Sequence, residues 1–156
     1  GGPRVLEFNC RFGDPECQPL MSRLQGDLLE VLWCTAAGSL GTLENGLETD
    51  SRTACCVVLC SEGYPGPFTK GHPITGIEAA EACGGPGEEV LVYHAGTTRN
   101  ADGELVTNGG RVLGVTALAS DLARAQALAN EAAEKIHFAG AFHRSDIGSR
   151  VLTPHS

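Results

Sequence analysis

The alternation of apolar and polar positions divides the chain into a helical first third and a β-rich remainder. Residues 4–9 alternate like a strand, whose two faces carry side chains of different kinds. After a turn at 14–16, leucines recur every fourth position, which predicts helix with one face in a core. Asp14 is expected as the helix cap, and regular helix is expected from Gln18 or Pro19. The leucines concerned are Leu20, Leu24, Leu28 and Leu32.

Gly26 interrupts this leucine pattern, and Asp27 stands three residues before Glu30. A glycine inside a helix costs about 1 kcal/mol relative to alanine, and Asp-x-x-Glu is typical of a helix N-terminus. The pattern therefore predicts two helices that meet at Gly26. Residues 37–50 are rich in Gly, Thr, Asn and Glu without clear periodicity, so we expect a connection there and a domain boundary near Asp50.

The remaining pattern predicts a small antiparallel sheet. Residues 53–60 are apolar on both faces, as in a buried strand. Glycine-containing turns separate the later apolar runs, so three or four antiparallel strands are expected. The later strands are expected at 90–97, 105–107 and 111–119, with at most a short strand at 74–77 and a loop at 81–87.

One long helix follows the last strand, with Ser120 or Asp121 as its cap. Its apolar positions recur by three and four, which predicts that it packs on the sheet. These positions are Leu122, Ala125, Ala129, Ala132 and Ile136. Gly140 is expected to end this region, and residues 141–152 form a tail that docks through Phe142, Ile147 and Val151, followed by a disordered end at 153–156.

Composition narrows the class of partner. The chain has 156 residues, is 42% apolar, and carries 19 acidic against 11 basic residues, for a net charge of −8. Without a Lys/Arg cluster, this balance argues against nucleic acid or an anionic membrane as partner. No apolar run approaches the ~20 residues of a membrane span, and the N-terminus lacks the order of a signal peptide. We therefore expect a soluble, cytoplasmic protein.

The seven cysteines form no C-x-x-C pair and no His/Cys zinc spacing. We expect reduced thiols. Cys55, Cys56 and Cys60 lie in an apolar run and are expected to act as small core hydrophobes.

The candidate chemistry is densest in residues 6–16, which read LEFNCRFGDPE. In a strand, Glu7, Asn9 and Arg11 share one face, with ~6–7 Å between the first two Cα atoms. Carboxylate and amide oxygens at that spacing suit Mg²⁺ held together with nucleotide phosphates, and Arg11 adds a fork for a phosphate or acyl phosphate. The turn at 13–15 is expected to fold the chain back and bring Glu16 near the same pocket. Spacing alone favours the alternative, a merely solvated strand face.

The string FNCRFGDPE resembles the metal-binding strand of the ATP-grasp ligases, in the version carried by the phosphoribosylamine–glycine ligase family. The likeness covers nearly the whole chain and continues through GYPG at 63–66, HAGT at 94–97, NGGRVLGVTA at 108–117 and DIG at 146–148. It implies an α+β fold. Residues 1–50 would be the C-terminal end of an ATP-grasp catalytic domain, and 51–152 a small, mainly antiparallel β domain with a packed C-terminal helix.

The resemblance also implies an activity. Family members join glycine to 5-phosphoribosylamine through an acyl phosphate, with cleavage of ATP, in de novo purine biosynthesis. Glu7 and Asn9 would bind Mg²⁺ or Mn²⁺, Arg11 would act catalytically by steadying the transferred phosphoryl group, and Glu16 would join Arg11 at the nucleotide. Asp14 would orient these groups or contact substrate, and Arg111 would face the substrate phosphate or close a domain contact.

Other glycine and histidine signals have a structural interpretation. Gly63 and the pair Gly109 and Gly110 resemble phosphate cradles, but without a following helix each is more typical of a turn. His94, at a strand end, is expected to be hydrogen-bonded structure.

Two rival functions stay open. Another ATP-grasp enzyme, such as a carboxylase, shares E-x-N-x-R, although FGDPE, HAGT and NGGRVL favour the glycine ligase. A non-catalytic module that completes a separately encoded partner is the second. Since no adenine pocket or phosphate lid is evident, we expect upstream domains of the same enzyme to supply them, and the chain alone to be inactive.

Overall fold

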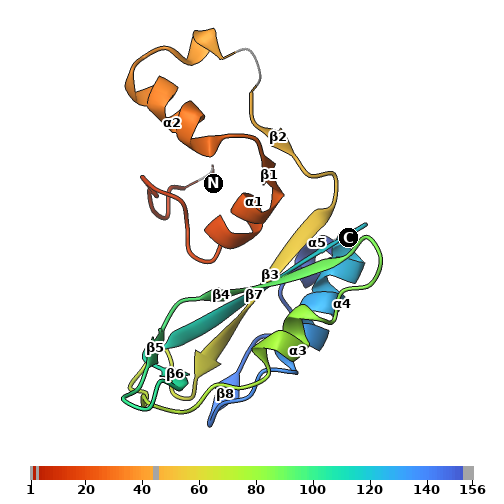
Figure 1. Cartoon of the computed structure of the whole chain (residues 1–156). Coiled ribbons are helices and arrows are strands. Elements are labelled where there is room, and N and C mark those ends of the chain that lie inside the picture. The colour runs from red at the N-terminus through yellow and green to blue at the C-terminus, as the bar shows by residue number, and fades with distance from the viewer. Residues whose placement is uncertain (1, 3, 44–45, 153–156) are drawn as a thin grey trace.

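A computed structural model describes residues 2, 4–43 and 46–152 of the chain (Figure 1). Its helices are α1 (Cys17–Arg23), α2 (Leu28–Ala36), α3 (Ile77–Glu81), α4 (Leu122–Ala133) and α5 (Ser149–Leu152), with a 3₁₀ turn η1 (Leu40–Thr42). Its strands are β1 (Leu24–Gln25), β2 (Glu48–Thr49), β3 (Thr53–Ser61), β4 (Glu89–His94), β5 (Thr97–Arg99), β6 (Leu105–Thr107), β7 (Arg111–Ala119) and β8 (Ala141–Phe142).

The two long strands β3 and β7 form the centre of a four-stranded antiparallel sheet, in the order β4-β7-β3-β8. Their register pairs Val57 with Val115 and Cys56 with Thr116. The hairpin β5-β6 makes a separate two-stranded sheet. The predicted buried strand and the predicted small antiparallel sheet are therefore confirmed.

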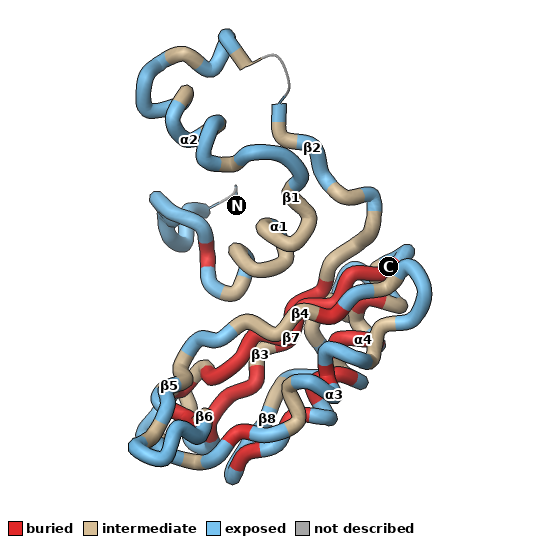
Figure 2. The backbone as a smooth tube through the Cα atoms, in the orientation of Figure 1, coloured by how far each residue is buried: buried red, intermediate tan, exposed pale blue. Residues whose placement is uncertain are grey.

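Helix α4 covers one face of this sheet. Asp121 caps it, since its Oδ1 accepts a hydrogen bond from the backbone N–H of Arg124 at 2.9 Å. Leu128 and Ala129 pack on Val57 and Val115 in the main core, and all four are fully buried. In Figure 2 the buried residues appear as red stretches along the strands of the sheet and along α4. The predicted C-terminal helix and its packing are confirmed.

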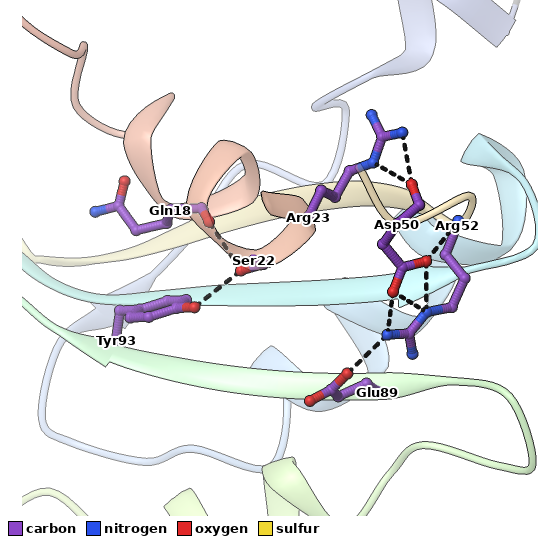
Figure 3. A network of polar contacts seen from close by, with 7 residues as sticks. All are labelled: Gln18, Ser22, Arg23, Asp50, Arg52, Glu89 and Tyr93. Carbon is purple, nitrogen blue, oxygen red and sulfur yellow. Dashed lines mark hydrogen bonds and ion pairs between the residues drawn. The ribbon is translucent and has the colours of Figure 1, made fainter. Parts of the chain in front are cut away.

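Helix α1 lies on the opposite face. Alternate residues of a strand point to opposite sides, so Cys56, Thr116 and Gly114 face away from α4. There Gln18 of α1 approaches Gly114, where an added Cβ would lie 3.9 Å from the Gln18 Cγ. The hydroxyl groups of Ser22 and Tyr93 are hydrogen-bonded at 2.8 Å (Figure 3). The sheet is thus covered on both sides, by α4 and in part by α1.

Ion pairs fasten the chain where it passes from the first part to the sheet. Arg23 donates to the carbonyl oxygen of Asp50, with Nη2 at 2.9 Å. Arg52 binds the Asp50 carboxylate at 2.6 Å and Glu89 of β4 at 3.0 Å (Figure 3). These contacts hold together the end of α1, the residues just before β3, and the start of β4.

The prediction of a strand at residues 4–9 was wrong. Residues 4–12 carry no regular structure and are exposed. A strand needs a neighbour to satisfy its backbone groups, and no strand lies beside this segment in the described part of the chain. Asp14 as helix cap was also wrong, because Glu16 precedes α1, which begins at Cys17, and no side chain caps that helix.

The leucine pattern does not face a core, contrary to expectation. Leu20 is 43% exposed and Leu32 is 50% exposed, because no described element covers that side of the helices. The predicted helix break is confirmed. Gly26 has φ 100°, and Asp27 caps α2 by accepting from the Glu30 N–H at 3.1 Å.

The connection at 37–50 contains more order than expected, since η1 lies in it and β2 pairs with β1. Helix α3 was missed altogether. The residues before it form only isolated bridges, including Thr75 with His137, instead of a short strand. Gly76 at its N-terminus has φ 87° and packs directly on the backbone of Lys135, which leaves no room for a side chain.

The C-terminal tail docks unevenly. Phe142 lies in β8 and is 41% exposed, while Ile147 packs against the small cluster of Cys55, Ala119 and Ala125. Val151 is exposed, so its predicted docking was wrong. The expected disorder at 153–156 concerns residues outside those described.

All seven cysteines are free thiols, as expected. Cys55, Cys56 and Cys60 are buried, and burial raises the pKa of all three, that of Cys55 to about 11. Over the described residues, none of the helices has the length and apolar character to cross a membrane.

Candidate metal and phosphate site

Glu7, Asn9 and Arg11 lie next to one another even though no strand forms. The Asn9 Nδ2 donates to Glu7 Oε1 at 3.3 Å, and the Arg11 Nη1 donates to Asn9 Oδ1 at 2.7 Å. A locally extended backbone is sufficient for this, since alternate side chains of an extended segment share a face. The three side chains predicted to act together are thus adjacent.

The turn after them folds Glu16 back toward the segment. Gly13 is buried, and its carbonyl accepts the Cys17 N–H at 2.8 Å, which starts α1. The Glu16 carboxylate lies against Gly13 so closely that a Cβ at residue 13 would overlap its Oε2. A glycine is therefore required here for Glu16 to adopt this position.

Arg111 reaches the same place from the start of β7. Its Nη1 donates to the carbonyl oxygen of Asp14 at 3.1 Å, and its Nη2 lies 3.4 Å from the Asp14 Oδ2. Asp14 and Arg111 are 97 positions apart in the sequence. The folded chain therefore joins a residue of the first part to the edge of the sheet.

A corner of close-packed glycines holds Arg111. The Gly96 N–H donates to the Arg111 carbonyl at 2.9 Å, and a Cβ at Gly96 would come within 2.5 Å of the Gly109 Cα. Ser61 Oγ donates to the Gly109 carbonyl at 2.9 Å. These glycines serve close backbone packing, in agreement with the turn interpretation.

All six residues singled out from the sequence line one polar hollow. Its lining consists of Glu7, Asn9, Arg11, Gly13, Asp14, Pro15, Glu16 and Arg111. Three carboxylates and two guanidinium groups thus surround a small space. Such a mixture can hold a cation and an anion side by side, as metal and phosphate are in a nucleotide complex.

The donor set fits a hard divalent cation that is shared with another ligand. Glu7 supplies a carboxylate oxygen and Asn9 an amide oxygen, both suited to Mg²⁺ or Mn²⁺. Among the described residues, no group of three or more His, Cys, Asp or Glu side chains is placed to hold a metal. Mg²⁺ usually keeps several waters and takes one or two protein oxygens plus phosphates, which is the arrangement that this pair allows.

His94 is hydrogen-bonded, as expected. Its Nδ1 is hydrogen-bonded to the Thr97 Oγ1 at 3.0 Å, across the link between β4 and β5.

A second, mostly apolar hollow of about 380 Å³ was missed by sequence reasoning. It shares Pro15 and Arg111 with the polar hollow, and Cys56, Val58 and Cys60 of β3 also line it. The sequence did indicate that residues 53–60 are apolar on both faces. Since α1 covers only part of the face opposite α4, an apolar hollow is left there.

The geometry defines a class of protein: a small α+β domain joined to a segment whose carboxylate, amide and guanidinium groups could hold a metal and a phosphate. The profile of the family described as "Phosphoribosylglycinamide synthetase, C domain" matches residues 54–150. The chain belongs to this family.

Curated relatives agree with this assignment. The chain is 53% identical to a phosphoribosylamine–glycine ligase of Rhodopirellula baltica over 152 residues, which cover 97% of this chain and 33% of the relative. It is 48% identical to the human trifunctional purine biosynthetic protein adenosine-3, again over 97% of this chain but 14% of that protein. The chain spans about a third of the length of the bacterial relatives it matches.

A solved structure supports the fold. The crystal structure of phosphoribosylamine–glycine ligase from Thermotoga maritima matches with a TM-score of 0.70 and 34% identity, over 94% of this chain and 34% of that one. The expected α+β class with antiparallel sheets is therefore confirmed.

Proposed function

We propose that this chain is the C-terminal part of a cytoplasmic ATP-dependent ligase of purine biosynthesis that joins glycine to 5-phosphoribosylamine, giving glycinamide ribonucleotide, ADP and phosphate. The observation that carries the proposal is the meeting of Glu7, Asn9, Arg11 and Glu16 with Asp14 and Arg111 around one hollow. The names of the relatives favour the glycine ligase over an ATP-grasp carboxylase.

In this proposal the residues around the hollow stabilise the negative charge of the phosphoryl group as it is transferred. Glycine's carboxylate must be phosphorylated before an amine can attack it, and a metal ion would neutralise the phosphate oxygens during that transfer. Glu7 and Asn9 hold the metal, and Arg11 places its fork on the transferred phosphoryl group. Glu16 lies beside Arg11 on the nucleotide side, while Asp14 and Arg111 form the wall on the substrate side.

We further propose that residues 1–50 complete an ATP-grasp catalytic domain and that 51–152 form the small C-terminal domain. Two protein oxygens bind Mg²⁺ weakly by themselves, so nucleotide phosphates and upstream domains of the full enzyme complete the site. The chain alone is then inactive.

Metal binding gives the direct test of the site. Mn²⁺ titration of the 156-residue chain, followed by electron paramagnetic resonance, should show weak binding that Glu7→Gln and Asn9→Ala each reduce. Glu30→Gln, which changes an exposed carboxylate of α2 that does not line the hollow, is the matched control and should leave binding unchanged. Equal binding by all variants would remove Glu7 and Asn9 from the metal site.

Activity tests the assignment as a whole. ADP formation should depend on both glycine and phosphoribosylamine, and should appear only when an upstream fragment from a relative is added to the chain. Bicarbonate-dependent ADP release in place of glycine dependence would favour the carboxylase. No activity on complementation, with a stable complex formed, would favour a non-catalytic module.

A further inference from the structure

Among the residues that line the polar hollow, Arg111 is the one that belongs to the sheet. We propose that Arg111 is a positioning residue: it grips Asp14 and thereby holds the segment that presents Glu7, Asn9 and Arg11. The inference rests on the proposed function for its catalytic consequence, but not for the contact itself.

The segment needs an anchor because it has little support of its own. Residues 4–12 are exposed, and the described part of the chain shows no backbone-to-backbone hydrogen bond from any of them. The contacts among Glu7, Asn9 and Arg11 stay within the segment and do not attach it to the sheet. Its attachment begins at Gly13, whose carbonyl accepts the Cys17 N–H at 2.8 Å, and at Asp14, which Arg111 contacts.

The grip on Asp14 uses the particular shape of an arginine. One nitrogen of Arg111 donates to the backbone carbonyl of Asp14 and another faces its carboxylate, at 3.1 and 3.4 Å. A planar fork can bind two such acceptors at once, whereas the single ammonium group of lysine cannot reproduce that geometry. Arg111 therefore restrains the backbone of the turn as well as one side chain.

The other end of the grip is rigid. Arg111 lies at the first residue of β7, and its carbonyl accepts from Gly96, whose backbone is packed against Gly109. Ser61 of β3 donates through its N–H to the Gly110 carbonyl at 2.8 Å. Because two strands and two turns fix this corner, Arg111 transmits the position of the sheet to the turn at Asp14.

This arrangement assigns Arg111 a role different from a direct grip on substrate. Its two contacting nitrogens are already engaged by Asp14, and its side chain is 40% exposed, so the pair is worth little to global stability. Its effect falls on the order of the turn and on the metal ligands beyond it.

The first experiment does not depend on metal. Backbone ¹⁵N relaxation of the 156-residue chain should show order parameters for residues 11–14 that fall below about 0.6 in Arg111→Ala, while β3 and β7 stay near 0.85. Arg111→Lys should restore order only in part. Arg99→Ala, which removes a guanidinium bonded locally to the Gly103 carbonyl, is the matched control and should leave residues 11–14 unchanged.

A charge swap separates the contact from a general loss of charge. Asp14→Arg and Arg111→Asp should each lower order in the turn, and the double variant should recover part of it, since the pair is re-formed with the signs reversed. Unchanged order in Arg111→Ala, or no recovery in the double variant, would overturn the positioning role.

The second experiment measures the consequence. Arg111→Ala should weaken Mn²⁺ binding by about threefold to tenfold, although Arg111 is no metal ligand, because Glu7 and Asn9 lose their fixed placement. If the wild-type chain binds no Mn²⁺ at Glu7 and Asn9, the proposed function fails, yet the order parameters still decide the role of Arg111. Metal binding that is sensitive to Glu7→Gln but not to Arg111→Ala would sink the inference alone.

Discussion

At the scale of single residues, two arginine side chains lower the pKa values of the carboxylates to which they are hydrogen-bonded. Arg52 holds the pKa of Asp50 at about 2, mainly through side-chain hydrogen bonds. Arg124 of α4 lowers the pKa of Glu88 to about 2 in the same way. The Arg124 Nε lies 2.6 Å from the Glu88 Oε1. The second pair ties the loop before β4 to the helix that covers the sheet.

The Glu88 pair makes stability depend on pH in a definite sense. The folded pKa of about 2 lies below the ordinary 4.5, so the stabilisation is complete above about pH 4.5 and is lost as the pH falls toward 2. Glu88→Gln should therefore be less stable than the wild type to urea at pH 7, and the difference should shrink between pH 4.5 and 2.

Glu134→Gln, which changes an exposed carboxylate just after α4, serves as the control and should show no such convergence. A wild-type advantage over Glu88→Gln that persists unchanged at pH 2 would contradict the assignment of the ion pair.

The cysteines offer a second prediction at this scale. Cys10 is exposed, whereas Cys55 and Cys56 are buried with raised pKa values and carry little thiolate near neutral pH. Iodoacetamide at pH 7.5 should label Cys10 within minutes and leave Cys55 and Cys56 unmodified until denaturant is added, as measured by mass spectrometry of peptides. Early labelling of Cys55 would show that the edge of the core opens readily.

At the scale of elements, Gly26 separates two helices that the leucine pattern would otherwise join. Its φ of 100° is a conformation that side chains with a Cβ rarely adopt, and β1 intervenes between α1 and α2. Because the first helix ends before Gly26, Leu24 and Gln25 form β1, which pairs with β2 on the far side of α2 in the sequence.

Gly26→Ala should lower local stability by about 1 kcal/mol or more, through the positive φ and not through a clash. The nearest atom to an added Cβ is Leu47 Cδ2, at an ordinary 3.8 Å. The measurement is hydrogen exchange of the α1 and α2 amides. Gly41→Ala, at an open position without positive φ, is the matched control and should be neutral. Greater protection in Gly26→Ala would mean that the helices prefer to be continuous.

At the scale of the whole molecule, the two parts of the chain differ in how much apolar surface they bury. The core of β3, β7 and α4 is closed, whereas Leu29 and Trp33 of α2 are each 73% exposed. Polar contacts, such as Ser22 with Tyr93, hold α1 on the sheet. Apolar burial supplies most of the stability of a fold, so the first part depends on the second.

Native-state hydrogen exchange should therefore reveal two levels of stability. Amides of α1 and α2 should open at a free energy well below that of β3 and β7, whose exchange should require global unfolding. Tyr93→Phe should lower the α1 value further, by about 1 kcal/mol, and leave the sheet unchanged. Equal opening free energies across the chain would show a single cooperative unit.

The sequence by itself determined the elements whose signals are local. Apolar residues on both faces of 53–60, Asp121 before a three-and-four pattern, and Gly26 followed by Asp27 are complete within a few positions, so β3, α4 and the helix break could be predicted. The side chains of the candidate site could be identified from the sequence as well, because suitability for metal or phosphate depends first on which chemical groups are present.

Tertiary structure alone decided the rest. The alternation at residues 4–9 did not become a strand, since backbone pairing depends on a neighbour and not on the segment. Helix α3 depends on Gly76 packing against Lys135, which is distant in sequence. The contact of Arg111 with Asp14 spans 97 positions. No local pattern encodes such a distance, because it is the folded sheet that brings the two residues within reach of each other.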